Sequence, residues 1–382
     1  MTASDWHTDA FPELRPGPPW VMQEMIAAQP AVIDVLLRHP PDEAATAVDA
    51  IRSALQGDLP VTVCGCGTSE HAAHAIATLL GGAAGAGRAH LLRARPSLDA
   101  ALDPRAGVCI AISHDGETRA TVLALDAARA AGAHTIAITQ AGESSVARAA
   151  ELALLTPRHD DSWCHTIAYT SAIAAGAALA AGLGPLVVSP DATAELVRCA
   201  TADAAPLAAR LADRRVVLCA GALTDHITAR ELALKLAEGA RMPTVGLELE
   251  TVLHGQLAGH EAGDALILVA ITDHDAHQRL ARRTTDVARA AGAIGLPVAA
   301  LLSDRLDAVL AADLTPGGRM VVALPDRDHV DPQLAGLLAG AGALQTLTVA
   351  LAGARQTNPD LIRREQEPYR RAAQAAEGSG DW

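Results

Sequence analysis

The most distinctive chemical group in this sequence is a lysine. The 382-residue chain carries 30 basic residues, and Lys235 is the only lysine among them. An ammonium group can act as a compact point charge or give up a proton where a guanidinium group cannot, so a lysine retained in such a chain is a candidate for chemistry. Glu238 follows three residues later, on the same face of a predicted helix. The spacing alone favours an ordinary surface ion pair; the scarcity of lysine argues for a reactive one.

Two turns in the first half of the chain have the residue types of a phosphate site. The apolar run 61–63 leads into Gly67, Thr68 and Ser69, and the run 109–112 leads into the hydroxyl-rich segment 113–118. Backbone N–H groups at a helix start lack partners and attract anions. Each turn alone is better explained by ordinary helix capping. The two turns together predict a clamp around one phosphate, because parallel α/β sheets bind ligands at the carboxyl ends of their strands.

Alternating strands and helices must position these groups. Strand-like runs begin at residues 61, 107, 134 and 151, and a second cycle has runs at 214, 266, 297 and 320. Half of the residues are apolar and only 2% are aromatic, which suits helices packed on parallel strands. The sequence predicts an α/β fold with two doubly wound units, 41–195 and 206–352. A segment 1–40 precedes them, with a helix over 20–37 that could break at Pro30, and a tail 353–382 follows.

The ordered series of motifs resembles the sugar isomerase (SIS) domain family, in particular the tandem-domain isomerase half of glucosamine-6-phosphate synthases and amino-sugar-phosphate deaminases and isomerases. The likeness covers about residues 20–365. It includes Cys66-Gly67-Thr68-Ser69, the segments 113–118, 142–145 and 232–238, and Leu253-His254-Gly255. The resemblance implies two flavodoxin-like three-layer α/β/α domains, and a homodimer with active sites near the subunit boundary.

The resemblance also implies roles for individual residues. Enolisation of a sugar phosphate requires ring opening, removal of a proton beside the carbonyl, and stabilisation of the negative charge that develops. By resemblance, Glu238 moves the proton between C1 and C2, His254 of a neighbouring subunit assists ring opening, and Lys235 neutralises the charge. The 6-phosphate would be held by Gly67, Thr68, Ser69, Ser113, His114 and Thr118. A loop with Trp163, His165 and Thr166, joined by Arg364 of the tail, is expected to shape specificity.

Three departures from the family pattern matter. Arg363 and Arg364 stand near the position of a lysine that forms a Schiff base in the synthases, and arginine cannot form that imine. Asp115 replaces a serine that faces phosphate, and its carboxylate would repel a dianion unless it turns away. No glutaminase segment with a cysteine nucleophile is present in the sequence, so we expect no synthase activity.

These observations predict an aldose–ketose isomerase that acts on an amino-sugar 6-phosphate, with or without loss of ammonia. One alternative is a lyase, which would eliminate water from an N-acetylhexosamine 6-phosphate through the same enolate. Another is a phosphosugar sensor without turnover, although Lys235, Glu238 and His254 argue against it.

Charge and composition limit the partners. The chain has 44 acidic residues and a net charge of −14, which repels nucleic acids. The first 19 residues have no apolar run, and the alanine-rich stretch 170–186 is interrupted by glycines, so we expect a cytoplasmic protein without a membrane anchor. The six cysteines are expected to be free thiols.

Two clusters have the residue types of a metal site. Cys64 and Cys66 precede His71 and His74, but two cysteines separated by one residue are closer than zinc sites usually require. The segment 273–277, with two aspartates and two histidines, follows a predicted strand and is typical of a polar cap. We therefore expect no metal and no other cofactor.

Overall fold

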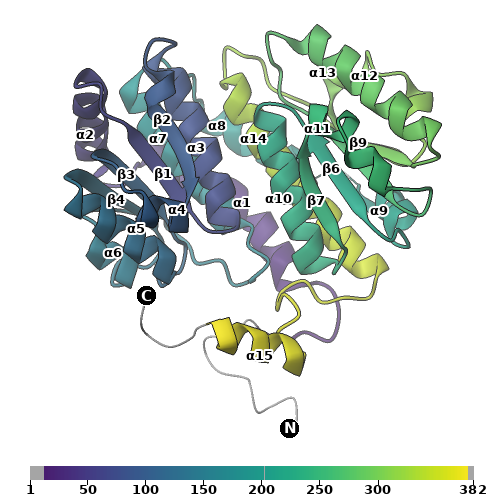
Figure 1. The fold of residues 1–382 in the computed structure, drawn as a ribbon, viewed down its shortest axis with the longest axis horizontal. Coiled ribbons are helices and arrows are strands. Elements are labelled where there is room, and N and C mark those ends of the chain that lie inside the picture. The colour runs from purple at the N-terminus through teal and green to yellow at the C-terminus, as the bar shows by residue number, and fades with distance from the viewer. Residues whose placement is uncertain (1–12, 202, 377–382) are drawn as a thin grey trace.

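Two α/β units lie side by side in the computed structural model, which describes residues 13–201 and 203–376 (Figure 1). Each unit has one five-stranded sheet with parallel pairing, and this confirms the predicted fold class. The sheet orders are β2-β1-β3-β4-β5 and β10-β9-β8-β6-β7, which is the same topology counted from the first strand of each unit. The strands are β1 (Val61–Gly65), β2 (Leu92–Pro96), β3 (Gly107–Ile112), β4 (Ala133–Thr139), β5 (Leu152–Leu155), β6 (Val217–Gly221), β7 (Thr244–Glu248), β8 (Ala265–Ala270), β9 (Val298–Ser303) and β10 (Gly318–Val322).

The sequence pattern predicts eight of these strands and misses β2 and β7. Both lie at the edge of a sheet, where a strand is paired on one side only. The sequence of β2 is LRARP and that of β7 is TVGLE, and most of their side chains are partly exposed. The central strands β1 and β3 are buried at every position. Strands β5 and β10 are edge strands as well, but residues 152–155 and 320–322 still form apolar runs that the pattern detects. In β2 and β7, arginines or a glycine with polar residues interrupt any such run.

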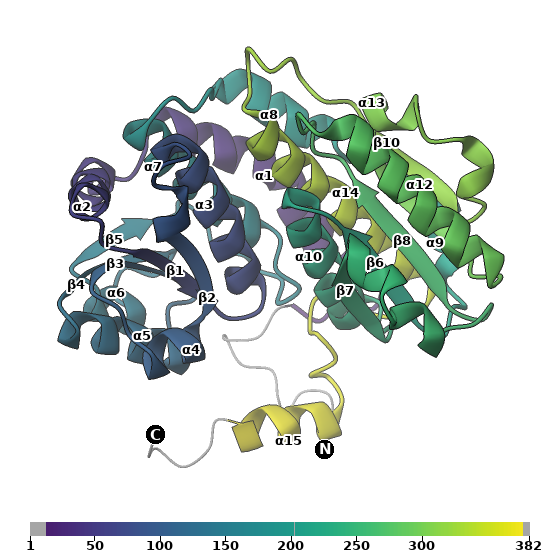
Figure 2. The ribbon, with the colours of Figure 1, turned by 45° about the horizontal axis from the view of Figure 1, so that its top comes forward.

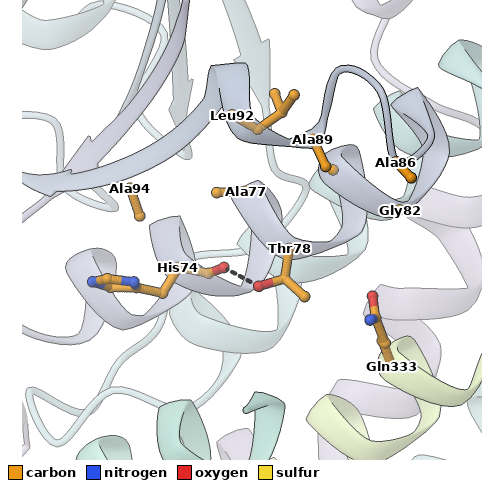
Figure 3. Close-up of a pocket in the computed structure, with 10 residues that line it drawn as sticks. His74, Ala77, Thr78, Gly82, Ala86, Ala89, Leu92, Ala94 and Gln333 are labelled. Atoms are coloured by element: carbon orange, nitrogen blue, oxygen red, sulfur yellow. Dashed lines mark hydrogen bonds between the residues drawn. The ribbon is translucent and has the colours of Figure 1, made fainter. Parts of the chain in front are cut away.

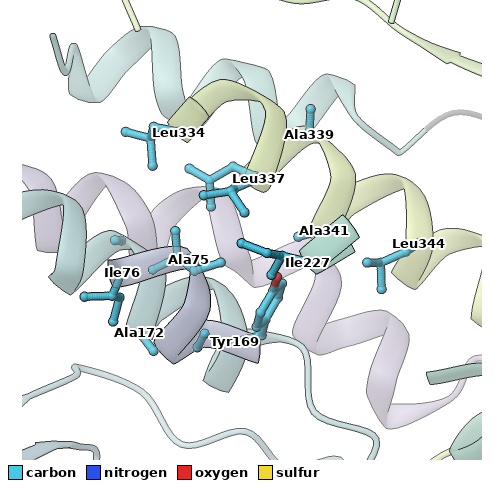
Figure 4. Close-up of a cluster of buried hydrophobic side chains, with 14 of the residues drawn as sticks. Ala75, Ile76, Tyr169, Ala172, Ile227, Leu334, Leu337, Ala339, Ala341 and Leu344 are labelled. Atoms are coloured by element: carbon cyan, nitrogen blue, oxygen red, sulfur yellow. The ribbon is translucent and has the colours of Figure 1, made fainter. Parts of the chain in front are cut away.

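A continuous hydrophobic core joins the two units. Figure 4 shows part of it, where Ile76, Tyr169, Ile227 and Leu337 come from four helices of both units. Figure 2 shows α3 on one side and α10 with α14 on the other, between the two sheets. The helices are α1 (Val21–Arg38), α2 (Ala44–Gln56), α3 (Thr68–Ala84), α4 (Ser97–Leu102), α5 (Arg119–Ala130), α6 (Ser145–Ala149), α7 (Ile167–Leu183), α8 (Pro190–Cys199), α9 (Ala205–Leu211), α10 (Thr224–Gly239), α11 (Leu249–Leu253), α12 (His277–Ala293), α13 (Asp304–Asp307), α14 (Pro332–Ala354) and α15 (Glu367–Ala376), with short 3₁₀ turns at Ala89–Leu91, Gln256–Gly259 and Ala312–Leu314.

Helix α14 is the central helix of this core. It is long and apolar enough to cross a membrane by length and composition, but 83% of its most apolar window is buried inside the protein. A helix that is hydrophobic all round is expected in the centre of a large domain as well as in a bilayer. Its burial against α10 and the other core helices accounts for its composition.

Helix α1 runs through Pro30 without a break. Proline has no N–H, so the carbonyl oxygen of Ile26 loses its usual partner four residues on. The side chain of Gln29 supplies one instead, because its Nε2 donates to that oxygen at 3.3 Å. Gln29 also bonds to Gln345 of α14 at 2.7 Å, which ties α1 to the core.

The carboxylate of Asp360 packs the C-terminal tail against the start of α1. Its two oxygens accept hydrogen bonds from the N–H groups of Val21 and Met22 at 2.9 and 2.8 Å, and Ser162 Oγ donates to it at 2.9 Å. The first N–H groups of a helix have no partner within the helix, so a carboxylate from elsewhere in the chain can cap them. The tail, α1 and the loop before α7 therefore meet at one buried residue.

Candidate active site

The two predicted phosphate turns meet at the switch point of the first sheet. Strands β1 and β3 are neighbours, and the strand order reverses between them, which is where doubly wound sheets bind ligands. After β1, Gly67 adopts a φ of 57°, a conformation that favours glycine, and α3 begins with Thr68. After β3, the hydroxyl oxygens of Ser113 and Thr118 lie 3.1 Å apart. The fold thus brings the predicted phosphate residues to one edge.

Helix α10 carries a cluster of three charged side chains, of which two are buried and the third is partly exposed. Lys235 Nζ lies 2.6 Å from Glu238 Oε2 and 3.6 Å from Glu231 Oε1. The side chains of Lys235 and Glu231 are 1% exposed, and that of Glu238 is 21% exposed. The spacing of four and three residues places all three on one face of the helix. Lys235 is therefore not part of a surface ion pair.

Glu231 joins this cluster to the first phosphate turn. Thr68 Oγ1 donates to Glu231 Oε1 at 3.2 Å, and His71 Nδ1 lies 2.6 Å from Glu231 Oε2. Thr68 and His71 belong to α3 of the first unit, whereas Glu231 belongs to the second. The sequence reasoning missed Glu231, although its position four residues before Lys235 was a usable signal. Its bond to His71 spans 160 residues, and no local pattern could show it.

Burial and mutual attraction set the charges in this cluster. Burial alone would lower the pKa of Lys235, but the carboxylates of Glu238 and Glu231 outweigh burial and raise it. Burial favours a raised pKa for Glu231 too, yet Lys235 and His71 lower it. For Glu238 burial is the stronger effect, and its pKa is raised above the ordinary value. A carboxylate with a raised pKa beside a fixed cation suits a group that accepts and returns a proton.

Two further imidazoles line the same region, and both are held neutral. His114 and His165 have ring centroids 5.6 Å apart. Burial lowers the pKa of each to about 4, and Lys235 contributes to the shift of His165. His114 Nε2 accepts the N–H of Asp160 at 2.8 Å, so the ring proton of neutral His114 lies on Nδ1. His165 Nδ1 is buried and has no hydrogen-bond partner among the described residues.

Asp115 turns its carboxylate toward His159. The Oδ1 atom lies 3.1 Å from His159 Nε2, and His159 Nδ1 lies 3.3 Å from Asp161. The bond to Asp115 and the second aspartate raise the pKa of His159 to about 9. His114, Asp115 and His159 have potential metal ligand atoms within 4.8 Å of one another. However, Nε2 of His114 already accepts a hydrogen bond, and a neutral imidazole offers only one lone pair.

His254 is not brought to this cluster within one chain. It follows α11, its side chain is 74% exposed, and its nearest ionic partner is Glu250 at 3.4 Å. Glu250 also pairs with Arg283 of α12. A role for His254 in the site of the same chain is not supported by this position.

Comparison with known proteins identifies a domain family in the first unit. Residues 60–182 match the family model of the SIS domain. The chain therefore contains a SIS domain. The chain is 27% identical over 332 residues to glutamine–fructose-6-phosphate aminotransferase (isomerizing) of Corynebacterium diphtheriae, a match covering 78% of this chain and 52% of that protein. It is 29% identical over 184 residues to the Arabidopsis thaliana enzyme of that name, covering 44% and 27%. The matches thus span about half or less of these relatives.

Solved structures of SIS-type proteins share the whole fold. The C-terminal domain of glucosamine-fructose-6-phosphate aminotransferase from Francisella tularensis has a TM-score of 0.75 at 16% identity, covering 91% of this chain and 99% of that one. Tagatose-6-phosphate ketose/aldose isomerase from Escherichia coli has a TM-score of 0.68 at 18% identity, covering 92% and 97%. At these identities the likeness establishes the tandem arrangement of two sheets.

The SIS protein's predicted specificity loop packs against its tail. The guanidinium of Arg364 lies 4.7 Å from the ring centroid of Trp163, and the backbone N–H of Trp163 donates to Asp360 at 2.9 Å. The guanidinium of Arg364 therefore stacks on the Trp163 ring of the loop. Thr166 is buried, and its hydroxyl has no partner among the described residues.

Several residues of the two rival metal clusters have other contacts or differ in burial. Cys64 is buried and Cys66 is exposed, and His71 is bonded to Glu231. In the second cluster Asp273 pairs with Arg305 and Arg327, which makes it a charged turn; the side chain of His277 lies outside the described part of the structure.

A surface groove on α3 lies apart from the charged cluster. Its lining includes His74, Thr78 and Gln333, with small residues between them (Figure 3). His74 and His71 are three residues apart on α3, but His71 faces Glu231, whereas His74 lines the groove. The groove is thus no part of the candidate site.

Proposed function

We propose that this SIS protein is an enzyme that enolises an amino-sugar 6-phosphate, as an aldose–ketose isomerase with or without release of ammonia. The observation that carries the proposal is the hydrogen bond between Thr68 and Glu231. It joins a turn suited to phosphate to a buried cluster of one cation and two carboxylates. Substrate held by its phosphate at the turn would lie beside groups that can move a proton and stabilise an enolate.

The residues divide the chemistry in a simple way. Glu238 removes the proton from C2 of the open-chain aldose and returns it to C1, and the charge that develops on oxygen is stabilised by Lys235. Glu231 and His71 hold Lys235 in place and do not react. If C2 bears an amino group, return of the proton to C1 leaves an imine at C2, and addition of water with loss of ammonia yields the ketose.

Imine formation by the protein itself is not part of this mechanism. Lys235 is buried between two carboxylates that keep it protonated, and a protonated amine is not a nucleophile. Arg363 and Arg364 lie over Tyr369 and Trp163. This favours the lyase as the second candidate, because loss of the 3-hydroxyl from an N-acetylated enolate requires no imine.

We also propose a cytoplasmic homodimer in which His254 serves the site of the partner. The support is its exposed position, which fits a contact with another chain better than a role in its own chain.

The test is incubation with the 6-phosphates of glucosamine, N-acetylglucosamine and galactosamine, followed by product mass, released ammonia and ultraviolet absorbance. A product of unchanged mass identifies an isomerase, ammonia a deaminase, and loss of water with new absorbance a lyase. Binding of all three sugars without conversion would contradict the proposal and support a sensor.

A further inference from the structure

The second unit repeats the backbone of the first phosphate turn. The residue before α3 is Gly67, with φ 57° and ψ −124°, and the residue before α10 is Leu223, with φ 53° and ψ −125°. A Cβ atom added at Gly65 would lie 2.4 Å from the backbone carbon of Ser69, and one added at Gly221 would lie 2.4 Å from the backbone oxygen of Asp225. In both turns, therefore, the glycine at the end of the strand packs against the backbone of the second residue of the following helix, Ser69 or Asp225.

The strand register extends this equivalence to the turns that follow β3 and β8. Cys64 of β1 pairs with Ala111 of β3, and Ala220 of β6 pairs with Leu268 of β8. Cys64 and Ala220 each precede the equivalent glycines, so Ala111 corresponds to Leu268. Counting on from these residues, His114 and Asp115 correspond to Ile271 and Thr272, and Ser69 corresponds to Asp225.

Asp225 occupies the second switch point with its own carboxylate. Its oxygens accept hydrogen bonds from the N–H of Ile271 at 3.2 Å, the N–H of Thr272 at 3.0 Å and the hydroxyl of Thr272 at 2.7 Å. The residue is 4% exposed, and together with Thr272 it lines a small cavity at the end of β8. Two backbone N–H groups and a hydroxyl are donors that would equally bind a phosphate oxygen.

The corresponding donors of the first unit are open. The N–H groups of His114 and Asp115 are not hydrogen-bonded to any described residue, and Ser69 has a hydroxymethyl group in place of the carboxylate of Asp225. An external oxyanion can therefore take the position that a carboxylate fills in the second unit.

We propose that the second unit retains an oxyanion cradle that Asp225 closes from within, so that the chain binds one sugar phosphate, in the first unit only. The part that concerns the first unit rests on the proposed function; the closed second cradle does not. The carboxylate of Asp225 also holds the start of α10 against the end of β8, as a bound phosphate would hold the start of α3 against the end of β3. Asp225 is thus a positioning residue for the helix that carries Lys235.

Exchange of the paired residues tests the equivalence. Ser69→Asp together with Asp115→Thr copies the Asp225–Thr272 pair into the first unit and is expected to close it. Asp115→Thr alone is the matched control and leaves the first cradle open. Asp225→Ser copies Ser69 into the second unit and is expected to open it.

The probe is tungstate, a tetrahedral oxyanion, soaked into crystals of each variant and located by its anomalous scattering. We expect one tungstate per chain for the parent and for Asp115→Thr, none for the Ser69→Asp/Asp115→Thr variant, and two for Asp225→Ser. In solution, inorganic phosphate should raise the Tm of Asp225→Ser more than that of the parent, because it replaces the lost carboxylate.

Other outcomes would overturn the proposal. Tungstate in the second cradle of the parent would show that Asp225 does not close it, and a folded Asp225→Ser variant without a new site would show that no cradle lies beneath it. If Asp225→Ser does not fold, the Ser69→Asp/Asp115→Thr variant still decides, because retention of tungstate there refutes the equivalence. A parent without tungstate and an Asp225→Ser variant with one would refute the phosphate site of the proposed function and support the closed second cradle.

Discussion

At the scale of single residues, the sole lysine has a place that an arginine could not fill. Lys235 is enclosed by the carboxylates of Glu231 and Glu238 on one helix face, and a compact ammonium fits there with one short bond to Glu238. A buried ion pair of this kind adds little net stability, but removal of one partner leaves the other charges unpaired. The three charged groups therefore depend on one another, and the free energy that their burial costs indicates a functional role.

Replacement of Lys235 by methionine tests that unit. The variant leaves Glu231 and Glu238 without their cation, and we expect the free energy of unfolding to fall by about 3–5 kcal/mol in urea titrations. Addition of Glu231→Gln should restore part of the loss. The control is Arg198→Met, which breaks an exposed pair with Glu195 at the same i,i+3 spacing and should change stability by less than about 1 kcal/mol. Equal effects of both methionine variants would contradict the buried cluster.

Glu238 is the residue whose loss should stop the chemistry. We expect Glu238→Gln to lower kcat by about 10²–10⁴-fold, because general base catalysis contributes an effect of that size. Binding of the sugar phosphate should persist, since the phosphate turns are unchanged. Steady-state kinetics and calorimetric binding separate the two effects, with Glu195→Gln as the exposed control. A variant that turns over at the parental rate would show that another group is the base.

The buried imidazoles give a stability that depends on pH. An unfolded histidine titrates near pH 6.5, whereas burial lowers the pKa of His114 and His165 to about 4. The unfolded chain therefore binds more protons between these values, and folding stability is lost as the pH falls from about 6.5 to 4. Each imidazole accounts for about 3 kcal/mol over that range. Urea titrations should show a shallower loss for His165→Gln; an unchanged slope would argue against a buried neutral His165.

At the scale of elements, the ends of helices are fixed by side chains that come from elsewhere in the chain. Asp360 of the tail caps α1, Asp160 accepts the N–H groups of Thr166 and Ala168 at the start of α7, and Asp225 ties α10 to β8. Each contact uses the unpaired N–H groups of a strand or helix end. The loop and tail around the candidate site are thereby held in one arrangement.

The cap at α1 is open to a direct test. We expect Asp360→Ala to lower the free energy of unfolding by about 2 kcal/mol, because two helix N–H groups and the Ser162 hydroxyl lose their acceptor. The tail should also be released, and limited proteolysis after residue 355 should become faster. The control is Asp42→Ala, an exposed residue ahead of α2. Parental proteolysis of the Asp360 variant would show that other contacts hold the tail.

At the scale of the whole molecule, the two units have one topology and different uses. The shared core and the contact between Thr68 and Glu231 make the candidate site a product of both units: the first supplies the turns and the second supplies the charged helix. Neither unit alone would contain the complete set.

Mixing of variants tests the proposed dimer. Glu238→Gln and His254→Ala are each expected to lose most activity. If His254 acts on the partner's site, a dimer with one chain of each variant contains one intact site. When the two variants are mixed and refolded or co-expressed, random pairing makes about half of the dimers mixed, and each mixed dimer has one intact site out of two. The mixture should then regain up to about a quarter of the parental activity. A mixture no more active than its components would rule out a shared site.

The sequence by itself determined the buried strands, the two turns and the pairing of Lys235 with Glu238. These signals are local: a strand buried on both faces must be apolar throughout, and three residues along a helix always share a face. Strands β2 and β7 have polar residues or glycine in place of such a run, and this explains why they were missed, whereas the edge strands β5 and β10 keep an apolar run.

Only the tertiary structure decided which distant groups meet. The bond from His71 to Glu231, the cap of α1 by Asp360 and the exposed position of His254 depend on how the two units pack. The bonds of Asp225 to Ile271 and Thr272 lie within the second unit and depend on the pairing of β6 with β8, whereas in the sequence Asp225 is an ordinary acidic residue at a helix N-terminus. Contacts between residues more than a hundred positions apart are fixed by the shared core of the two units, and no spacing along the chain encodes them.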